Sequence, residues 1–205
     1  MLATLPQRHA AKSPTLLRAV SWALSIDTEM SIENRVLTSY KHFFENDIEN
    51  ALIQISITID AFSKKRYKIK KVGQRITAFL AENMETISLI GTSGFLRAPG
   101  MTFPDGDLEV IIYKSVRCSL LHEAEVANKL KFIKGHEFII LSDKFELNQN
   151  FVFGVILSIV VGDTDKILKL DKLPSFYFNN KSICIKDIHG NKQALFDLMS
   201  SAKNA

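Results

Sequence analysis

Arg117 and His122 are the two residues of this chain whose types and spacing suggest catalysis. They lie in the stretch YKSVRCSLLHEAE (Tyr113–Glu125), with four residues between them. Histidine has a pKa near neutrality and can transfer protons, whereas the planar arginine guanidinium is always charged and matches phosphate oxygens. RNA supplies its own nucleophile, the 2′-hydroxyl. One His and one Arg are therefore a sufficient minimum for cleavage of RNA to a 2′,3′-cyclic phosphate without a metal ion.

The spacing of this pair is weak evidence when it is taken alone. Five residues of a regular helix rotate the chain by about 140° and raise it by about 7.5 Å. The two side chains converge if the arginine reaches back, if the helix is irregular, or if a twofold axis joins two pairs in one cleft. Seven Arg and five His give about 0.5 such matches by chance, and Arg35 and His42 form a second match. For each pair, a surface arginine with a partly buried histidine is the alternative interpretation.

The residues before the pair predict two long helices. From Ser39 to Lys64 the apolar residues recur at steps of three and four, and acidic residues near position 47 fit the positive end of a helix dipole. The basic run Lys64–Lys71 closes this helix, as a solvated helix end or, alternatively, as an RNA contact. A second helix is predicted over Val72–Ile90. The residues expected to face inward in the two helices are Phe44, Ile48, Ala51, Leu52, Ile55, Ile59 and Phe62, then Ile76, Phe79, Leu80, Met84 and Ile87.

A loop rich in Gly and Pro, Gly91–Gly106, leads into the helix that carries the pair. A loop of this length is often functional, and a plain connection is the alternative. The helix is predicted to begin after Asp107, a candidate N-cap, and to run over LEVIIYKSVRCSLLHEAE (Leu108–Glu125). Its apolar stripe is Leu108, Ile111, Ile112, Val116, Leu120 and Leu121.

The C-terminal third of the chain mixes short strands with helices. Alternating residues and Gly135 predict a β-hairpin near 131–147, and FVFGVILSIVV (Phe151–Val161) predicts a buried helix. A second hairpin turns at Asn179–Lys181, and NKQALFDLMSSA predicts a short terminal helix. The fold class is therefore mainly α, a helical bundle with small β-hairpin insertions toward the C-terminus.

Three regions divide the chain. Residues 1–29 contain no acidic residue before Asp27, which is typical of a transit peptide, and we interpret them as an N-terminal extension, partly helical. An ordered helix that packs on the body is the alternative. Residues 30–163 are expected to form the helical domain with its hairpin. Residues 164–205 are expected to add the second hairpin and the short helix to the same body.

Composition excludes several classes of function. The chain has 205 residues, a formal net charge of +4 and a pI of about 9.0, which permits a polyanionic partner without demanding one. Its two cysteines, Cys118 and Cys184, form no metal-binding pattern and are expected to be reduced thiols. We predict no metal and no cofactor. The longest apolar stretch, with 11 residues, is too short to span a bilayer, so we expect no membrane partner and a cytoplasmic protein.

The stretch RCSLLHE, preceded by the helix LEVIIYKSV and a Gly-rich loop, resembles the HEPN superfamily. This superfamily consists of helical-bundle proteins with an R-x4–6-H motif, many of which are metal-independent ribonucleases. YKHFFENDIENALIQISITIDAFSKK resembles the long early helix of a bacterial HEPN-like group. FELNQNFVFGVILSIVVGD resembles the helix that follows the motif after a β-hairpin insertion. The resemblance covers roughly Ser31 to Asp163, and only the Arg/His motif is chemically specific.

The resemblance implies a metal-independent endoribonuclease with Arg117 and His122 as its catalytic residues. It further implies a homodimer and a role in defence or in a toxin–antitoxin pair, with an antitoxin or other protein as partner. Arg35 and His42 lie too early for the motif and are interpreted as structural.

Three further residues near the motif are candidates for binding. Tyr113 and Lys114 lie one turn before the arginine and are candidates for contacts with RNA phosphate, whereas Glu123 follows the histidine directly; ordinary helix-surface residues are the alternative. Many active members have a polar residue after the arginine, where this chain has Cys118. A non-catalytic HEPN-like module that dimerises or binds RNA or protein is therefore the alternative function.

Overall fold

The computed structural model describes residues 31–103, 105–121, 130–135, 139–140, 145–166, 168–170, 173–178 and 181–201, and the backbone alone at 115–121, 139–140, 145 and 201. Clustering of contacts separates Met1–Ser31 from Ile32–Ala205. The predicted extension at residues 1–29 lies outside the described residues. Within them, no helix has both the length and the apolar character needed to cross a membrane.

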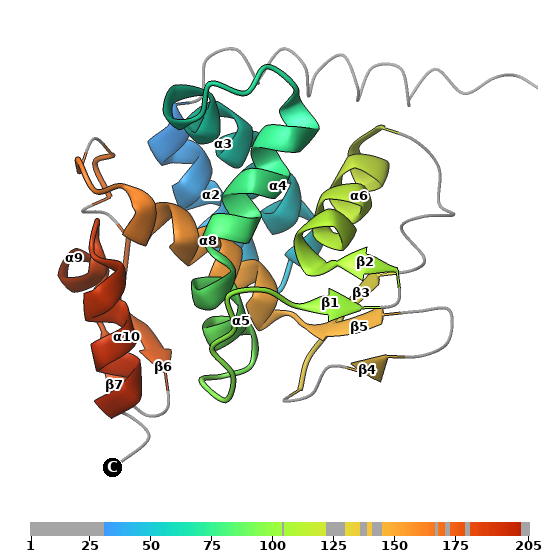
Figure 1. Cartoon of the computed structure of the whole chain (residues 1–205). Helices are drawn as coiled ribbons and strands as arrows, with labels where there is room; N and C mark the ends of the chain where they lie inside the picture. Colours follow the sequence, from blue (N-terminus) through green and yellow to red (C-terminus); the bar gives the residue numbers. More distant parts are fainter. Residues whose placement is uncertain are drawn as a thin grey trace, which may run out of the picture. The chain divides into compact units, whose positions relative to one another are not determined.

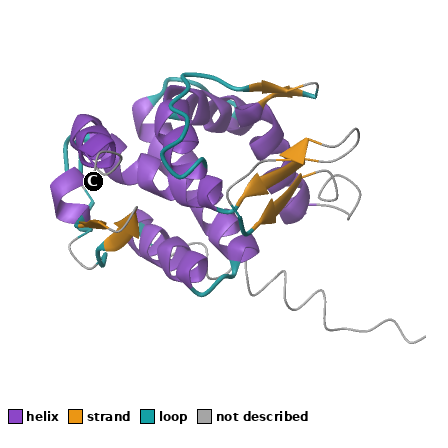
Figure 2. Ribbon diagram, turned by 90° about the horizontal axis from the view of Figure 1, so that it is seen from below, coloured by secondary structure: helices purple, strands orange, loops and turns teal. Residues whose placement is uncertain are grey.

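The prediction of a mainly helical chain with small β elements toward the C-terminus is confirmed (Figures 1 and 2). The helices are α2 (Ile32–Phe44), α3 (Ile48–Arg66), α4 (Val72–Glu82), α5 (Met84–Gly91), α6 (Leu108–Leu121), α8 (Asn150–Gly162), α9 (Ile185–Ile188) and α10 (Lys192–Ser201). The strands are β1 (Thr102–Phe103), β2 (Gly106–Asp107), β3 (Leu130–Ile133), β4 (Ile139–Ile140), β5 (Phe145–Asn148), β6 (Phe176–Phe178) and β7 (Lys181–Ile183).

The structure has two helices where one helix was predicted from Ser39 to Lys64, so the prediction of a continuous helix was wrong. The chain turns between α2 and α3 at Asn46, which has a positive φ of 64°. Asp47 then caps α3, because its carboxylate accepts hydrogen bonds from the backbone and side-chain nitrogens of Asn50 at 3.4 and 2.8 Å. The two helices fold back on each other, and the Ser39 hydroxyl donates to the carbonyl of Ala51 at 2.7 Å. Phe44, expected inside, ends α2 with 55% of its surface exposed.

The second predicted helix is also interrupted, at Asn83, where α4 ends and α5 begins. The amide of Asn83 donates back to the carbonyl of Phe79 at 2.9 Å. All five residues predicted to face inward are buried, namely Ile76, Phe79, Leu80, Met84 and Ile87. The apolar period therefore continues across the interruption, although the hydrogen-bonded helix does not.

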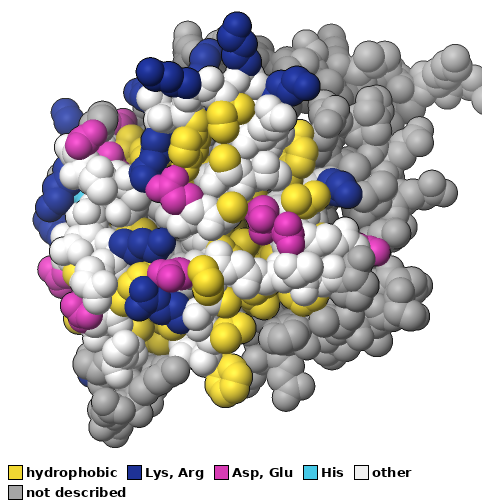
Figure 3. All heavy atoms as spheres, viewed as in Figure 1, with side chains coloured by type: hydrophobic (Ala, Val, Ile, Leu, Met, Phe, Trp, Pro, Cys, Tyr) yellow, Lys and Arg dark blue, Asp and Glu magenta, His cyan; other side chains and the backbone are white. Residues whose placement is uncertain are grey.

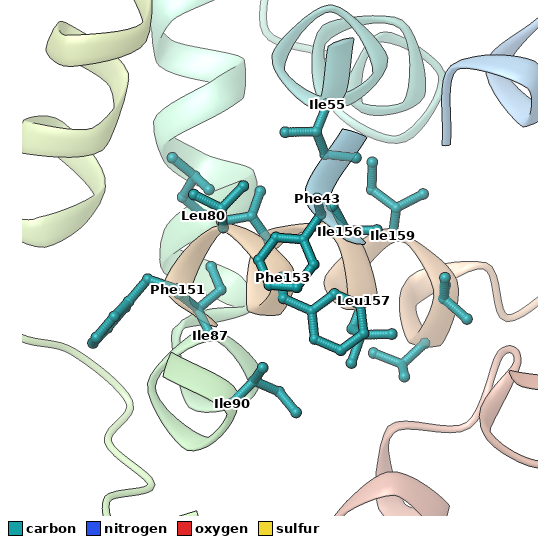
Figure 4. Packing of buried hydrophobic residues seen from close by; sticks show 14 of the residues in the cluster. Phe43, Ile55, Leu80, Ile87, Ile90, Phe151, Phe153, Ile156, Leu157 and Ile159 are labelled. Atoms are coloured by element: carbon teal, nitrogen blue, oxygen red, sulfur yellow. The ribbon is translucent and has the colours of Figure 1, made fainter. Parts of the chain in front are cut away.

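Helix α8 occupies the centre of the apolar core, as its sequence predicted. All residues from Phe151 to Val161 are buried, and side chains from α2, α3, α4 and α5 surround it (Figure 4). Close approach depends on two glycines. A Cβ atom at Gly154 would lie 2.9 Å from the backbone of Ile87 in α5, and one at Gly91 would lie 2.5 Å from the ring of Phe151. The absence of a side chain lets the two helices approach backbone to backbone at Gly154, and lets the ring of Phe151 lie against the backbone at Gly91.

The predicted loop at Gly91–Gly106 contains a small antiparallel pair, β1 with β2, which the sequence analysis did not predict. Asp107, the candidate N-cap of the next helix, is the last residue of β2. Its carboxylate accepts a hydrogen bond from the hydroxyl of Thr102 at 2.7 Å, and the backbone nitrogen of Leu108 donates to the carbonyl of Met101 at 2.8 Å. The hairpin therefore fixes the start of α6.

The strands near 131–147 form a three-stranded sheet with β5 in the middle. The antiparallel pair is β4 with β5, whereas β3 pairs with β5 in parallel, Leu130 opposite Phe145. The turn at Gly135, with a φ of 147°, therefore separates two strands that are not neighbours in the sheet. Alternation predicted the strands correctly, but it carries no information on which of them pair.

The second predicted hairpin is confirmed. Strands β6 and β7 pair antiparallel with Phe178 opposite Lys181. The alternation also holds, because Phe176 and Phe178 are buried and Tyr177 is 80% exposed. The terminal helix is α10, whose Leu195, Phe196 and Met199 are buried.

Candidate functional site

Helix α6 carries the arginine of the predicted motif and is held by its first two turns. Leu108, Ile111 and Ile112 are at least 92% buried, and the helix contacts α3 and α4. In Figure 1, α6 rises from the small β elements toward the end of the helical body where α4 begins. The first turns therefore attach the helix to the core.

Tyr113 and Gly73 fix the position of α6 relative to α4. A Cβ atom at Gly73 would lie 2.5 Å from the Tyr113 hydroxyl and 2.7 Å from its ring carbon Cζ. The tyrosine tip thus lies directly on the second residue of α4, where any side chain would collide with it. Arg117 follows one helical turn later, about 6 Å farther along the axis. Tyr113 thereby brings α6 next to Gly73, two residues after Lys71 in the connection between α3 and α4.

The predicted site residues are described to different extents. Arg117 is placed by its backbone alone, and His122 and Glu123 lie outside the described residues. Tyr113 is partly buried against α4 and Lys114 is exposed. Tyr113 and Lys114 lie in α6 one turn before Arg117, and Tyr113 has a packing contact with Gly73.

The basic run Lys64–Lys71 lies at the same end of the helical body. Lys64, Lys65 and Arg66 form the last turn of α3, as predicted. Lys68, Lys70 and Lys71 follow in the connection to α4 and are exposed, whereas Tyr67 and Ile69 between them are partly buried. Figure 3 shows the Lys and Arg side chains gathered at the top of the view, over this end.

Arg75 of α4 holds the basic connection in place from beneath. Its side chain is 7% exposed, and its Nη1 donates to the carbonyls of Ile69 and Lys70 at 3.0 and 2.6 Å. Its Nε and Nη2 donate to Oδ1 of Asp60 in α3 at 2.9 and 2.5 Å. One buried guanidinium therefore joins two helices and the segment between them.

A second cluster fixes the beginning of the connection. Arg66 and Tyr67 both donate hydrogen bonds to the carboxylate of Glu82 in α4, and Arg66 also donates to the carbonyl of Gly162 at 3.2 Å. Burial, and then the neighbouring Glu82, raises the pKa of the Tyr67 hydroxyl well above its usual range. Tyr67 therefore remains a neutral donor to Glu82 at physiological pH.

Comparison with known proteins gives one match. The family model described as Rv1289 matches residues 31–205. The chain belongs to the Rv1289 family. No curated protein and no solved structure matches it. The family match covers every element described above, from α2 to α10, and the HEPN resemblance stays a prediction.

The second Arg/His pair of this Rv1289-family chain has structural partners. Arg35 is 3% exposed and donates to Oε1 of Gln54 at 3.2 Å, which joins α2 to α3. His42 Nδ1 lies 3.0 Å from Oδ2 of Asp47. Hydrogen bonds from Asn50 and the proximity of His42 hold the pKa of Asp47 below its usual value. Both residues therefore support the turn between α2 and α3.

A buried Asp/His contact was not predicted from the sequence. His189 Nε2 lies 2.8 Å from Oδ2 of Asp163, whose side chain is 2% exposed, and the backbone nitrogen of Leu168 donates to the same oxygen at 2.8 Å. Asp163 also ends α8, and His189 is the C-cap of α9, so the contact attaches the end of α9 to the end of the central helix. Its members are 26 residues apart, and no local pattern signals their meeting.

Asp163 also lines a cavity of about 240 Å³ between the ends of α3 and α8. Lys65, Arg66 and Asp165 contribute its charged groups, and Phe62 contributes to its apolar floor. No group of three or more His, Cys, Asp or Glu side chains with metal-binding geometry occurs in the described part of the chain.

Proposed function

We propose that this Rv1289-family protein is a metal-independent endoribonuclease of HEPN type. His122 serves in proton transfer and Arg117 stabilises the charge on the phosphate. The 2′-hydroxyl loses its proton and attacks the adjacent phosphorus, the bond from phosphorus to the 5′-oxygen breaks, and that oxygen takes up a proton. The products are a 2′,3′-cyclic phosphate and a free 5′-hydroxyl.

The observation that carries this proposal is the packing of Tyr113 on Gly73. The buried first turns of α6 and this contact anchor the helix, which continues from Tyr113 through Arg117 to Leu121. The anchoring also restricts the motion of the helix, as catalysis by positioned groups requires.

The proposal includes a homodimer in the cytoplasm, in which two motifs face one cleft across a twofold axis. Two pairs in one cleft would compensate for the rotation of about 140° that separates an arginine and a histidine five residues apart on one helix. A role in defence, or as a toxin controlled by an antitoxin protein, belongs to the same proposal.

Cleavage of RNA in excess chelator tests the proposal. We expect the wild-type protein to cleave single-stranded RNA and to leave 2′,3′-cyclic phosphate ends. Arg117→Ala and His122→Ala should each lower the rate by 100-fold or more, in line with about 10²–10⁴-fold for a general acid or base. His42→Ala is the matched control, since His42 contacts Asp47, and it should keep full activity. Absence of cleavage, or equal cleavage rates in all variants, would refute the proposal that the protein is a ribonuclease.

The second candidate is a non-catalytic module that binds RNA or protein, and Cys118 after Arg117 favours it. In that case the same variants would change binding or dimerisation, and the RNA would stay intact. Analytical ultracentrifugation of the wild type and the two variants, together with the cleavage assay, separates the candidates.

A further inference from the structure

Five lysines at the junction of α3 and α4 form a surface that we call the lysine ridge. Its members are Lys64, Lys65, Lys68, Lys70 and Lys71, and all five are exposed. In the described part of the chain, no ammonium group of the ridge has a hydrogen bond or an ion pair. Five like charges within eight residues repel one another, so a surface of this kind is stabilised by an anionic partner.

Two acidic groups near the ridge, Asp60 and Glu82, are already engaged, whereas Asp163 and Asp165 line the same cavity as Lys65. Asp60 accepts two hydrogen bonds from Arg75, and Glu82 accepts hydrogen bonds from Arg66 and Tyr67. Arg66 and Arg75 thus neutralise Glu82 and Asp60, and in the described part of the chain the ammonium groups of Lys68, Lys70 and Lys71 have no ion pair. The positive charge of the ridge is therefore available to a partner from outside.

The shape of the ridge is fixed by the fold. Exposure alternates along the connection, with Lys68 and Lys70 outward and Tyr67 and Ile69 partly buried. The bonds from Arg75 to the carbonyls of Ile69 and Lys70 hold the backbone against α3 and α4. A partner that binds the ridge consequently loses little of its affinity to ordering of the loop.

We propose that the lysine ridge binds the phosphodiester backbone of single-stranded RNA and leads it to the end of α6. Lysine contacts a phosphate as a point charge, without reading bases, so the ridge confers affinity and direction and no sequence preference. The choice of RNA rests on the proposed function, since the Tyr113–Gly73 contact brings the α6 end to the same place.

A polymer fits the ridge better than a small anion or a membrane does. The charges follow the last turn of α3 and an extended connection, with backbone angles of −108° and 136° at Tyr67 and −80° and 124° at Lys71. Of the large apolar side chains that the structure records as exposed, only Val72 adjoins the ridge. A membrane-binding surface would need more apolar contact than one valine.

The test measures binding of a fluorescent 20-nucleotide RNA to full-length protein in the His122→Ala background, which prevents cleavage. In single-strand binding, each phosphate contact adds about 0.7 to the steepness with which the logarithm of the binding constant falls against the logarithm of the salt concentration. Lys68→Gln/Lys70→Gln should therefore lower the slope by about 1.4 and raise Kd about 25-fold at 0.1 M salt. Lys131→Gln/Lys186→Gln removes two exposed lysines from β3 and α9 and should leave Kd within about twofold.

The outcomes separate this inference from the enzyme. If only the ridge variant binds RNA more weakly, the proposal that the lysine ridge binds RNA is supported. This holds even if the wild-type protein cleaves no RNA and the proposed enzymatic activity is refuted. Equal Kd values for the two double variants overturn the ridge, even if cleavage is demonstrated. Binding to vesicles of phosphatidylserine and phosphatidylcholine without binding to RNA also overturns it. Equal thermal unfolding of the two variants serves as the check that both are folded.

Discussion

Arg75 shows how one buried side chain determines the position of a whole surface. It is the only arginine that the structure records as joining both Asp60 and the backbone of the basic connection. The guanidinium is suited to this role because its five N–H groups point in fixed directions within one plane. A lysine could not satisfy two carbonyls and a carboxylate in the same geometry.

Replacement of Arg75 by alanine should destabilise the fold by about 2–3 kcal/mol. The change leaves two backbone carbonyls and one carboxylate without their donor, and the 31% exposure of the Asp60 side chain moderates the loss by admitting water. Urea unfolding monitored by circular dichroism measures the effect. Arg97→Ala is the control, because Arg97 is 46% exposed in its contact with Glu85. That change should cost about 1 kcal/mol or less, and equal costs would contradict the assigned role.

The sequence suggests a chemistry for the candidate site, but it does not show the residues that support the site. Arg117 was found because its distance from His122 matches a known motif, and motifs are local. The supporting residues are not local: Gly73 and Tyr113, or Arg75 and Asp60, meet only after the helices pack. The basic run was correctly placed at the end of a helix, but which of its charges remain unpaired depends on Glu82, which lies 16 residues after Arg66.

At the scale of elements, the contact between α5 and α8 is a strong constraint on sequence. Helix α8 is apolar on all sides, as expected for a helix surrounded by others, and at Gly154 its backbone closely approaches the backbone of α5. There the backbone of Ile87 leaves no room for a Cβ atom. Any side chain at this position must push α5 and α8 apart.

Gly154→Ala should therefore destabilise the protein by about 1–3 kcal/mol, as overpacking of a core does. Helix propensity alone predicts the opposite sign, since alanine is favoured over glycine by about 1 kcal/mol within a helix. Gly162→Ala is the control in the same helix, because a Cβ atom there would have its nearest neighbour at 3.9 Å. Thermal unfolding should show a lower midpoint for the first variant and an unchanged or higher one for the second. A stabilising Gly154→Ala would disprove the contact.

Periodicity predicted where elements lie, and it failed where the chain changes direction or chooses a partner. The apolar steps of three and four continue through Asn46 and Asn83, so they gave no sign of the two interruptions. Asn46 in a left-handed conformation, followed by the capping carboxylate of Asp47, is a local signal of the first one. No comparable signal exists for the parallel pairing of β3 with β5, because strand alternation is the same for either neighbour.

At the scale of the whole described unit, polar contacts join its first helix to its C-terminal part. One of them is the hydrogen bond from the hydroxyl of Tyr40 in α2 to the carbonyl of Pro174, at 3.1 Å, across 134 positions of sequence. The ring of Tyr40 also contacts those of Phe44 and Phe153. The residue thus connects α2, the central helix α8 and the segment before β6.

Tyr40 should make the stability of the protein sensitive to alkali. Burial raises the pKa of its hydroxyl to about 12, above the value near 10 of an unfolded chain. The neutral hydroxyl is favoured in the folded state, so its contribution is fully present below about pH 10 and is lost as pH rises through about 12. Tyr40→Phe should cost about 1 kcal/mol at pH 8, through the unpaired Pro174 carbonyl, but should abolish this loss. The difference in unfolding free energy between wild type and variant should therefore shrink, and then reverse, between pH 10 and 12.

A constant difference in unfolding free energy across this pH range would contradict the role assigned to Tyr40. Tyr177→Phe is the control, because Tyr177 is 80% exposed, and its unfolding free energy should follow that of the wild type throughout.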